Sequence, residues 1–68
     1  MLQLIGIISG EIWNYLDSNK NKPASLTTIA KNINRKKEEA AYGVGWLAKE
    51  GKINFEEKGS TVKISLLK

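Results

Sequence analysis

The spacing of the apolar residues changes once along this chain, close to Gly51, and that change limits the folds open to it. Before Gly51, apolar residues recur three and four positions apart, which is typical of amphipathic helices. After it, residues 53–56 and 62–66 alternate between apolar and polar types, the pattern of strands with one wet face. Residues 57–60 lie between these runs and include a glycine suited to a turn. The sequence therefore predicts helices followed by a β-hairpin.

Three stretches carry the helical spacing. The first covers residues 2–17, and its apolar stripe is about 180° wide. The second is short; it begins after a capping hydroxyl from Ser25 or Thr27 and ends near Asn34, a residue type that tolerates left-handed backbone. The third covers residues 37–49 and is stopped by the glycine that follows.

The helices and the hairpin each leave an apolar face, so they must share one core. A very short strand over residues 24–26 precedes the second helix. Gly43 and Gly45 each cost the third helix roughly 1 kcal/mol relative to Ala, which predicts that one of them admits a closely packed neighbour. We predict a core of Leu4, Ile8, Ile12, Leu16, Leu26, Ile29, Ile33, Val44, Leu47, Ile53, Phe55, Val62, Ile64 and Leu66.

The local sequences also match a known pattern. Residues 26–31, Leu-Thr-Thr-Ile-Ala-Lys, look like the entry into the second helix of winged helix-turn-helix proteins. Residues 48–53, Ala-Lys-Glu-Gly-Lys-Ile, look like the end of their third helix running into the first wing strand, and residues 45–53 are similar to small prokaryotic winged-helix proteins. With the hairpin, the resemblance covers essentially the whole chain. It implies an α+β winged helix-turn-helix domain over residues 1–68: a three-helix core, a short strand and a C-terminal β-hairpin, the wing.

Composition excludes several classes of protein. Sixty-eight residues make one domain. The absence of Cys and His removes disulfide scaffolds, thiol nucleophiles and the commonest metal ligands, and no residue pair has an evident acid, base or nucleophile role. We therefore expect no enzyme activity, metal, cofactor or small-molecule substrate. Residues 1–8 are apolar but lack a basic n-region, and acids follow them, so we expect neither a signal peptide nor a membrane span and a cytoplasmic location.

A net charge of +4 permits a polyanionic partner without requiring one. The resemblance implies DNA binding, with helix 37–49 entering the major groove, and transcriptional regulation as the process served. Four glutamates oppose this. Glu38 and Glu39 occupy the groove-facing turn, where a carboxylate either accepts a cytosine amino hydrogen or repels the phosphates, and Glu56 and Glu57 make the wing nearly neutral. We expect double-stranded DNA to be contacted by residues at the winged-helix contact positions and by charged residues near them: Thr28, Arg35, Lys36, Lys37, Tyr42, Lys58 and Lys63.

The wide stripe of the first helix implies either a helix that the rest of the domain wraps fully or, as we expect, a homodimer, whose seam is formed by Leu2, Ile5, Ser9 and Trp13. Two-fold pairing would present two recognition helices to two half-sites. The same helix, together with the face around Trp46, could instead serve a protein-interaction or assembly module that never touches nucleic acid. The sequence leaves these two interpretations open.

Overall fold

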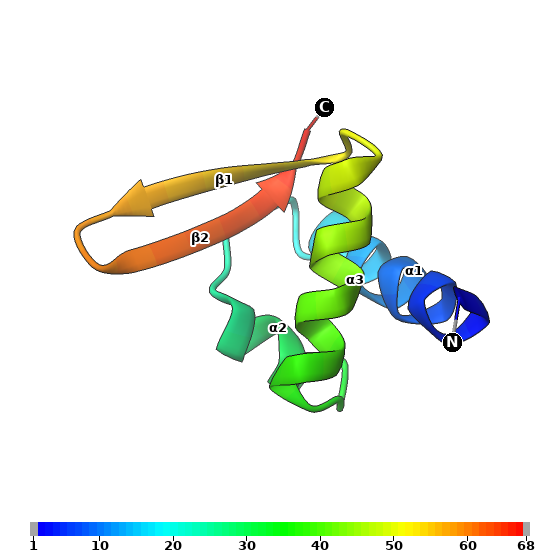
Figure 1. Cartoon of the computed structure of the whole chain (residues 1–68). Helices are drawn as coiled ribbons and strands as arrows, with labels where there is room; N and C mark the ends of the chain where they lie inside the picture. Colours follow the sequence, from blue (N-terminus) through cyan, green and yellow to red (C-terminus); the bar gives the residue numbers. More distant parts are fainter. Residues whose placement is uncertain (1, 68) are drawn as a thin grey trace.

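The computed structural model describes residues 2–67, without the side chain of Leu2. Three helices precede an antiparallel hairpin, which is the predicted winged helix fold (Figure 1). The third helix has the predicted bounds, and the first extends one residue further than predicted. In chain order the elements are α1 (Leu2–Ser18), α2 (Leu26–Asn32), α3 (Lys37–Lys49), β1 (Ile53–Lys58) and β2 (Thr61–Leu66).

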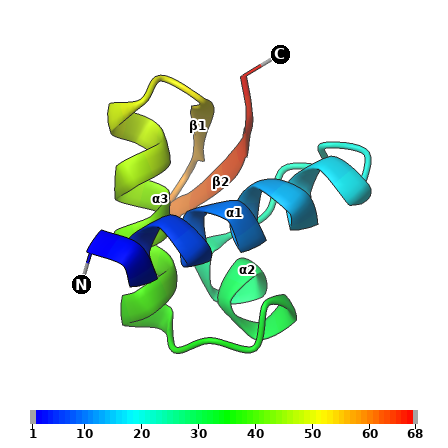
Figure 2. The same ribbon diagram turned by 90° about the vertical axis from the view of Figure 1, so that its right-hand side faces the viewer.

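Helix α1 lies across α3, and the two helices meet at Gly43 (Figure 2). A Cβ atom added there would lie 2.7 Å from both Ile8 Cγ2 and Ile12 Cδ1, so only glycine fits without movement. The predicted close approach is thus confirmed at Gly43. At Gly45 an added Cβ atom meets nothing within 4 Å, so Gly43 alone of the two glycines has this role.

Helix α2 begins after Ser25, whose hydroxyl oxygen accepts a hydrogen bond from the backbone N–H of Thr28 at 3.2 Å. Ser25, not Thr27, is therefore the cap. The helix ends through Asn34, which has a left-handed φ of 58°, as predicted. The next amide, that of Arg35, donates to the carbonyl oxygen of Ala30 at 3.0 Å and closes the turn.

The hairpin pairs Ile53 with Leu66 at its base and Lys58 with Thr61 at its tip. Gly59, with a φ of 59°, supplies the left-handed residue that its tight loop needs. The predicted strand over residues 24–26 is reduced to one bridge, because Ser25 already caps α2. In that bridge Ala24 N–H donates to the carbonyl oxygen of Ile64 at 2.9 Å, and Ile64 N–H donates back at 2.7 Å.

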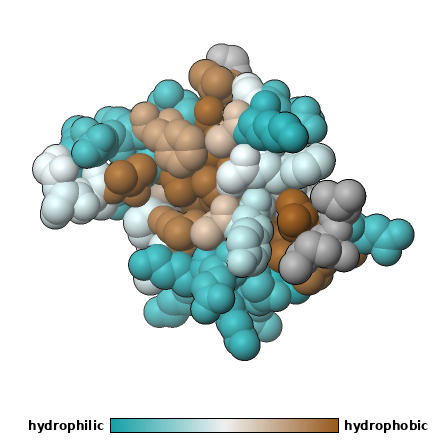
Figure 3. All heavy atoms as spheres, in the orientation of Figure 1, coloured by the Kyte–Doolittle hydropathy of each residue, from teal (hydrophilic) through white to brown (hydrophobic). Residues whose placement is uncertain are grey.

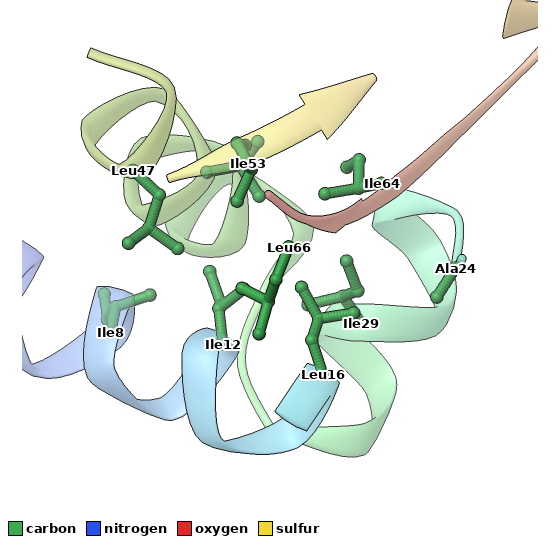
Figure 4. Close-up of a cluster of buried hydrophobic side chains, with 10 residues drawn as sticks. Ile8, Ile12, Leu16, Ala24, Ile29, Leu47, Ile53, Ile64 and Leu66 are labelled. Carbon is green, nitrogen blue, oxygen red and sulfur yellow. The ribbon is translucent and has the colours of Figure 1, made fainter. Parts of the chain in front are cut away.

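The core lies where α1, α2, α3 and the base of the hairpin meet (Figure 4). Ile12, Leu16 and Ile29 have no exposed surface. Leu26 and Ile33, also predicted, are half-buried at its edge. The predicted core residues that are buried are Ile8, Ile12, Leu16, Ile29, Val44, Leu47, Ile53, Ile64 and Leu66.

Three of the predicted core positions are wrong. Phe55 is 51% exposed and Val62 43%, although both lie on the same face of the hairpin as Ile64. Val62 lies near the tip of the hairpin, which extends past the helices (Figure 1), whereas Phe55 stands beside the buried Ile64 but on β1, which α1 and α2 do not contact. Leu4 is 39% exposed because it lies one turn before Ile8, at the edge of the buried stripe of α1.

Candidate nucleic-acid interface

Helix α3 presents one long side to solvent. Its exposed residues are Lys37, Glu38, Ala41, Tyr42, Gly45 and Lys49. Thirteen residues at 1.5 Å each give a helix of roughly 20 Å, enough to lie in a major groove. Tyr42 is 57% exposed, so its ring and hydroxyl are accessible. The exposed side of α3 is therefore free of the core along its full length.

One of the two glutamates in the first turn of α3 forms a capping hydrogen bond. The Glu39 carboxylate accepts a hydrogen bond from the backbone N–H of Lys36 at 3.0 Å and so caps the helix. Both Glu38 and Glu39 lie at the positive end of the helix dipole. Glu39 is half-buried and engaged, whereas Glu38 is exposed. Of these two glutamates, Glu39 is already bonded to the Lys36 amide, so the exposed Glu38 is the one that would repel a nearby phosphate.

Arg35 is placed differently from the prediction. Its guanidinium forms a two-pronged pair with Glu11 of α1, from Nε to Oε1 at 2.8 Å and from Nη2 to Oε2 at 3.1 Å. Nη1 also lies 3.8 Å from Glu39 Oε2. The hydrogen bond from Arg35 holds the pKa of the Glu11 carboxyl below its usual value. Arg35 thus ties the α2–α3 turn to α1, and its charge is already paired.

An open concavity of about 450 Å³ lies at the α2–α3 turn, and we call it the turn concavity. Lys31, Arg35 and Lys36 line it, against a single acid, Glu39. Lys31 and Lys36 are exposed and form no ion pair with any residue in the described part of the chain. Lys31 is not among the residues predicted from the sequence, and only the fold places it at the turn.

Thr28 lies on the exposed side of α2. Its backbone N–H is already engaged by Ser25, and its hydroxyl oxygen lies 3.0 Å from the Ser25 hydroxyl. The Ser25 hydroxyl donates in that contact, so the proton of the Thr28 hydroxyl remains available. Thr28 can therefore offer one hydroxyl donor, but not its backbone amide.

The wing carries both signs of charge. Lys58 at the tip is 81% exposed, and its Nζ lies 4.0 Å from Glu56 Oε1. Lys63 is half-buried and stands opposite Glu56 in the strand register. Apolar side chains gather between the hairpin and α3, with hydrophilic ones over the lower part of the molecule, where α3 begins (Figure 3). Of the two predicted wing lysines, Lys58 is thus fully accessible and Lys63 only partly so, and Glu56 offsets the charge of both.

The predicted dimer seam is only partly on the surface. Ser9 is buried, and its hydroxyl lies 2.7 Å from the carbonyl oxygen of Ile5 and 3.3 Å from that of Gly43. Including Ser9 was therefore wrong, because it belongs to the contact between α1 and α3. Trp13 is 38% exposed and Ile5 is half-buried, while the side chain of Leu2 lies outside the described residues.

A family model for the winged helix-turn-helix domain DUF2582 matches residues 1–66. The chain belongs to this family. BT2368 from Bacteroides thetaiotaomicron, solved by solution NMR, is 31% identical; the match covers 94% of this chain and 76% of BT2368, with a TM-score of 0.84. Among curated proteins, none matches the DUF2582 chain significantly.

The fold of this DUF2582 domain is also similar to that of a Zalpha domain. The Zalpha domain of Carassius auratus PKZ, solved in complex with Z-DNA, is 19% identical, with a TM-score of 0.76. The match covers 93% of this chain and 97% of that domain. Within residues 2–67, no helix is long and apolar enough to cross a membrane. The same residues contain no cluster of acids that could hold a metal ion.

Proposed function

We propose that this DUF2582 domain binds double-stranded DNA with α3 in the major groove. The observation that carries the proposal is the accessible side of α3, which begins at Lys37 beside the lysines of the turn concavity. The similarity in fold to a Zalpha domain solved with Z-DNA supports DNA binding by a scaffold of this shape. As a finer proposal, the protein is a transcriptional regulator that acts in the cytoplasm.

The side chains have different roles in this proposal. Lys31, Lys36 and Lys37 neutralise phosphates at the start of α3, and the Thr28 hydroxyl donates to the same backbone. Tyr42 contacts a base edge or the backbone from the middle of α3. The wing lysines, Lys58 and Lys63, reach the flanking backbone. Arg35 positions the turn through its pair with Glu11 and does not contact phosphate.

Salt-dependent binding to a short random-sequence duplex tests the proposal, measured by fluorescence anisotropy. Each phosphate contact contributes about 0.9 to the slope of log affinity against log salt. Replacing Lys36 and Lys37 together with Ala should therefore weaken binding and flatten that slope by about 1.8. Replacing Lys20 and Lys22 with Ala removes the same charge from the loop after α1 and is the matched control.

The outcomes are distinct. Absence of binding at low salt refutes DNA binding and leaves the protein-interaction interpretation of the fold. An equal loss in both double variants shows attraction by net charge alone and refutes the placement at α3. A CG-repeat duplex held in the Z form, titrated beside the random B-form duplex, shows which helical form the domain prefers.

We also propose a homodimer, because a domain with a net charge of +4 binds DNA weakly as a monomer. With Ser9 inside the molecule, the seam centres on two exposed apolar residues, Leu4 and Ile7, which lie three positions apart on one side of α1. Ile7 is 55% exposed, so Ile7→Glu should fold normally and shift a dimer to monomer in analytical sedimentation. A monomer mass for the wild type at every concentration refutes this part.

A further inference from the structure

A second concave feature lies between α1 and the C-terminal half of α3, away from the turn concavity. It has a volume of about 350 Å³, at the small end of ligand-binding pockets. Both tryptophans of the chain line it, Trp13 from α1 and Trp46 from α3. We call it the tryptophan cleft. It exists only because α1 crosses α3 at Gly43, so the two distant indoles could not be paired from the sequence.

The walls of the tryptophan cleft suit a flat apolar group. Trp13 is 38% exposed and Trp46 is half-buried. Gly6 and Gly10 form part of the α1 side, and a Cβ atom added at either meets nothing within 4 Å. Space therefore remains beside the indoles, and an aromatic ring placed there gains offset or edge-to-face contacts.

The rim of the cleft carries one charge of each sign. Glu50 and Lys52 line it, both exposed, on either side of the left-handed Gly51. Their backbone is fixed, since Glu50 N–H donates to the carbonyl oxygen of Trp46 at 3.1 Å and Lys52 N–H to that of Leu47 at 3.0 Å. Within the described residues, their charged groups pair neither with each other nor with another side chain.

These features together describe a ligand with a ring, an ammonium group and a carboxylate. We propose that the tryptophan cleft binds a free aromatic α-amino acid. The ring lies against Trp13 and Trp46, the ammonium group pairs with Glu50, and the carboxylate pairs with Lys52. Asn14, also on the rim, offers an amide that can donate to the carboxylate. The two charges of such a zwitterion complement those of Glu50 and Lys52, whereas an uncharged aromatic ligand would leave both side chains unpaired.

This site does not depend on DNA binding. Lys37 and Glu50 are 13 residues apart, which places their backbones roughly 20 Å apart along the helix axis. Ligand binding is therefore testable on the free domain. For a ligand of about a dozen heavy atoms in an open cleft, we expect a dissociation constant on the order of 1 mM.

L-phenylalanine is the probe, titrated against the full chain and followed by indole fluorescence excited at the red edge of the band. Phenylalanine does not absorb there, and both indoles of the protein lie at the site. 3-Phenylpropionate lacks the ammonium group, and phenethylamine lacks the carboxylate. We expect a saturable change with L-phenylalanine and at least fivefold weaker binding of both analogues.

Two variants test the charge pairing in the protein. Glu50→Gln should weaken L-phenylalanine binding severalfold and remove the advantage over 3-phenylpropionate. Lys52→Gln should do the same relative to phenethylamine. Both positions are exposed, so folding should be retained, and far-UV circular dichroism checks it. Glu57→Gln and Lys63→Gln remove the same charges from the wing and should bind as the wild type.

Three results would overturn the proposal. One is the absence of a saturable fluorescence change up to the solubility limit of L-phenylalanine. Another is equal binding of the three ligands, which shows that the rim charges take no part. The third is a ligand-free dimer in sedimentation whose Trp13→Ala variant is monomeric, because the partner copy would then fill the cleft.

Discussion

Two glycines in α3 should respond oppositely to the same substitution. Replacing Gly by Ala inside a helix gains roughly 1 kcal/mol of propensity. At Gly45 nothing lies within 4 Å of the new methyl, so Gly45→Ala should stabilise the domain by about that amount. At Gly43 the methyl would lie 2.7 Å from Ile8 Cγ2 and from Ile12 Cδ1, and 3.3 Å from the backbone nitrogen of Ser9. Because a backbone atom blocks one side, the methyl cannot simply move aside.

Overpacking of this kind costs roughly 1–3 kcal/mol, which exceeds the gain in propensity. Gly43→Ala should therefore lower the free energy of unfolding by about 1 kcal/mol. The free energies of unfolding of the two variants should then differ by about 2 kcal/mol. For a domain of this size that difference separates the two melting temperatures by roughly 8–16 °C. Thermal and urea unfolding, both followed by far-UV circular dichroism, measure it.

The contact with Ile12 gives an internal control. Ile12→Val removes the Cδ1 methyl that Gly43→Ala would strike, so the double variant should lose less stability than the sum of the two single variants. Equal stabilisation by Gly43→Ala and Gly45→Ala would refute the close approach of α1 and α3. Strict additivity with Ile12→Val would refute the assigned clash.

Three further expectations concern stability. The hydrogen bond from Arg35 lowers the pKa of Glu11, so the pair stabilises the fold above the usual glutamate pKa of 4.5, and this stabilisation disappears as pH falls through the lower folded-state pKa. When the urea midpoint is measured against pH, Glu11→Gln should reduce its fall on the acid side. Asn21 has a φ of 54° and holds the end of β2 by two side-chain hydrogen bonds, at 3.0 and 2.6 Å. Asn21→Ala should cost about 2–3 kcal/mol and Asn21→Gly less, because glycine avoids the left-handed strain. Phe55→Ala should cost under about 1 kcal/mol and Ile64→Ala roughly 2–5, by urea unfolding.

The fold was predictable because spacing, capping and turn residues agree along the chain. The left-handed positions at Asn34 and Gly59 and the bounds of α3 all follow from local rules. Alternation, however, does not say how far the helices extend beneath the hairpin. Phe55 has the same pattern as Ile53 but is 51% exposed, although Ile64 beside it on β2 is buried, because α1 and α2 pack against β2 and not against β1.

Predicting the candidate site was harder, because its residues depend on contacts between distant segments. Ser9 and Gly43 are 34 residues apart, and only their contact shows that Ser9 is an interior residue. Lys31 was missed because a single lysine on a short helix has no pattern of its own. It becomes noticeable only when the turn brings it beside Lys36.

The ion pair between Arg35 and Glu11 limits how well this domain can distinguish one DNA sequence from another. Arg35 is the only arginine in the chain, and its planar fork is engaged by Glu11. The other cations of the interface are lysines, which neutralise phosphates as point charges and lack the rigid two-pronged donor that reads guanine best. Glu38, exposed in the first turn of α3, adds repulsion toward any phosphate it approaches. We therefore expect salt-sensitive binding with little discrimination among B-form sequences, measured by competition between duplexes. A preference of 1,000-fold or more for one sequence would mean that the pair between Arg35 and Glu11 opens on binding.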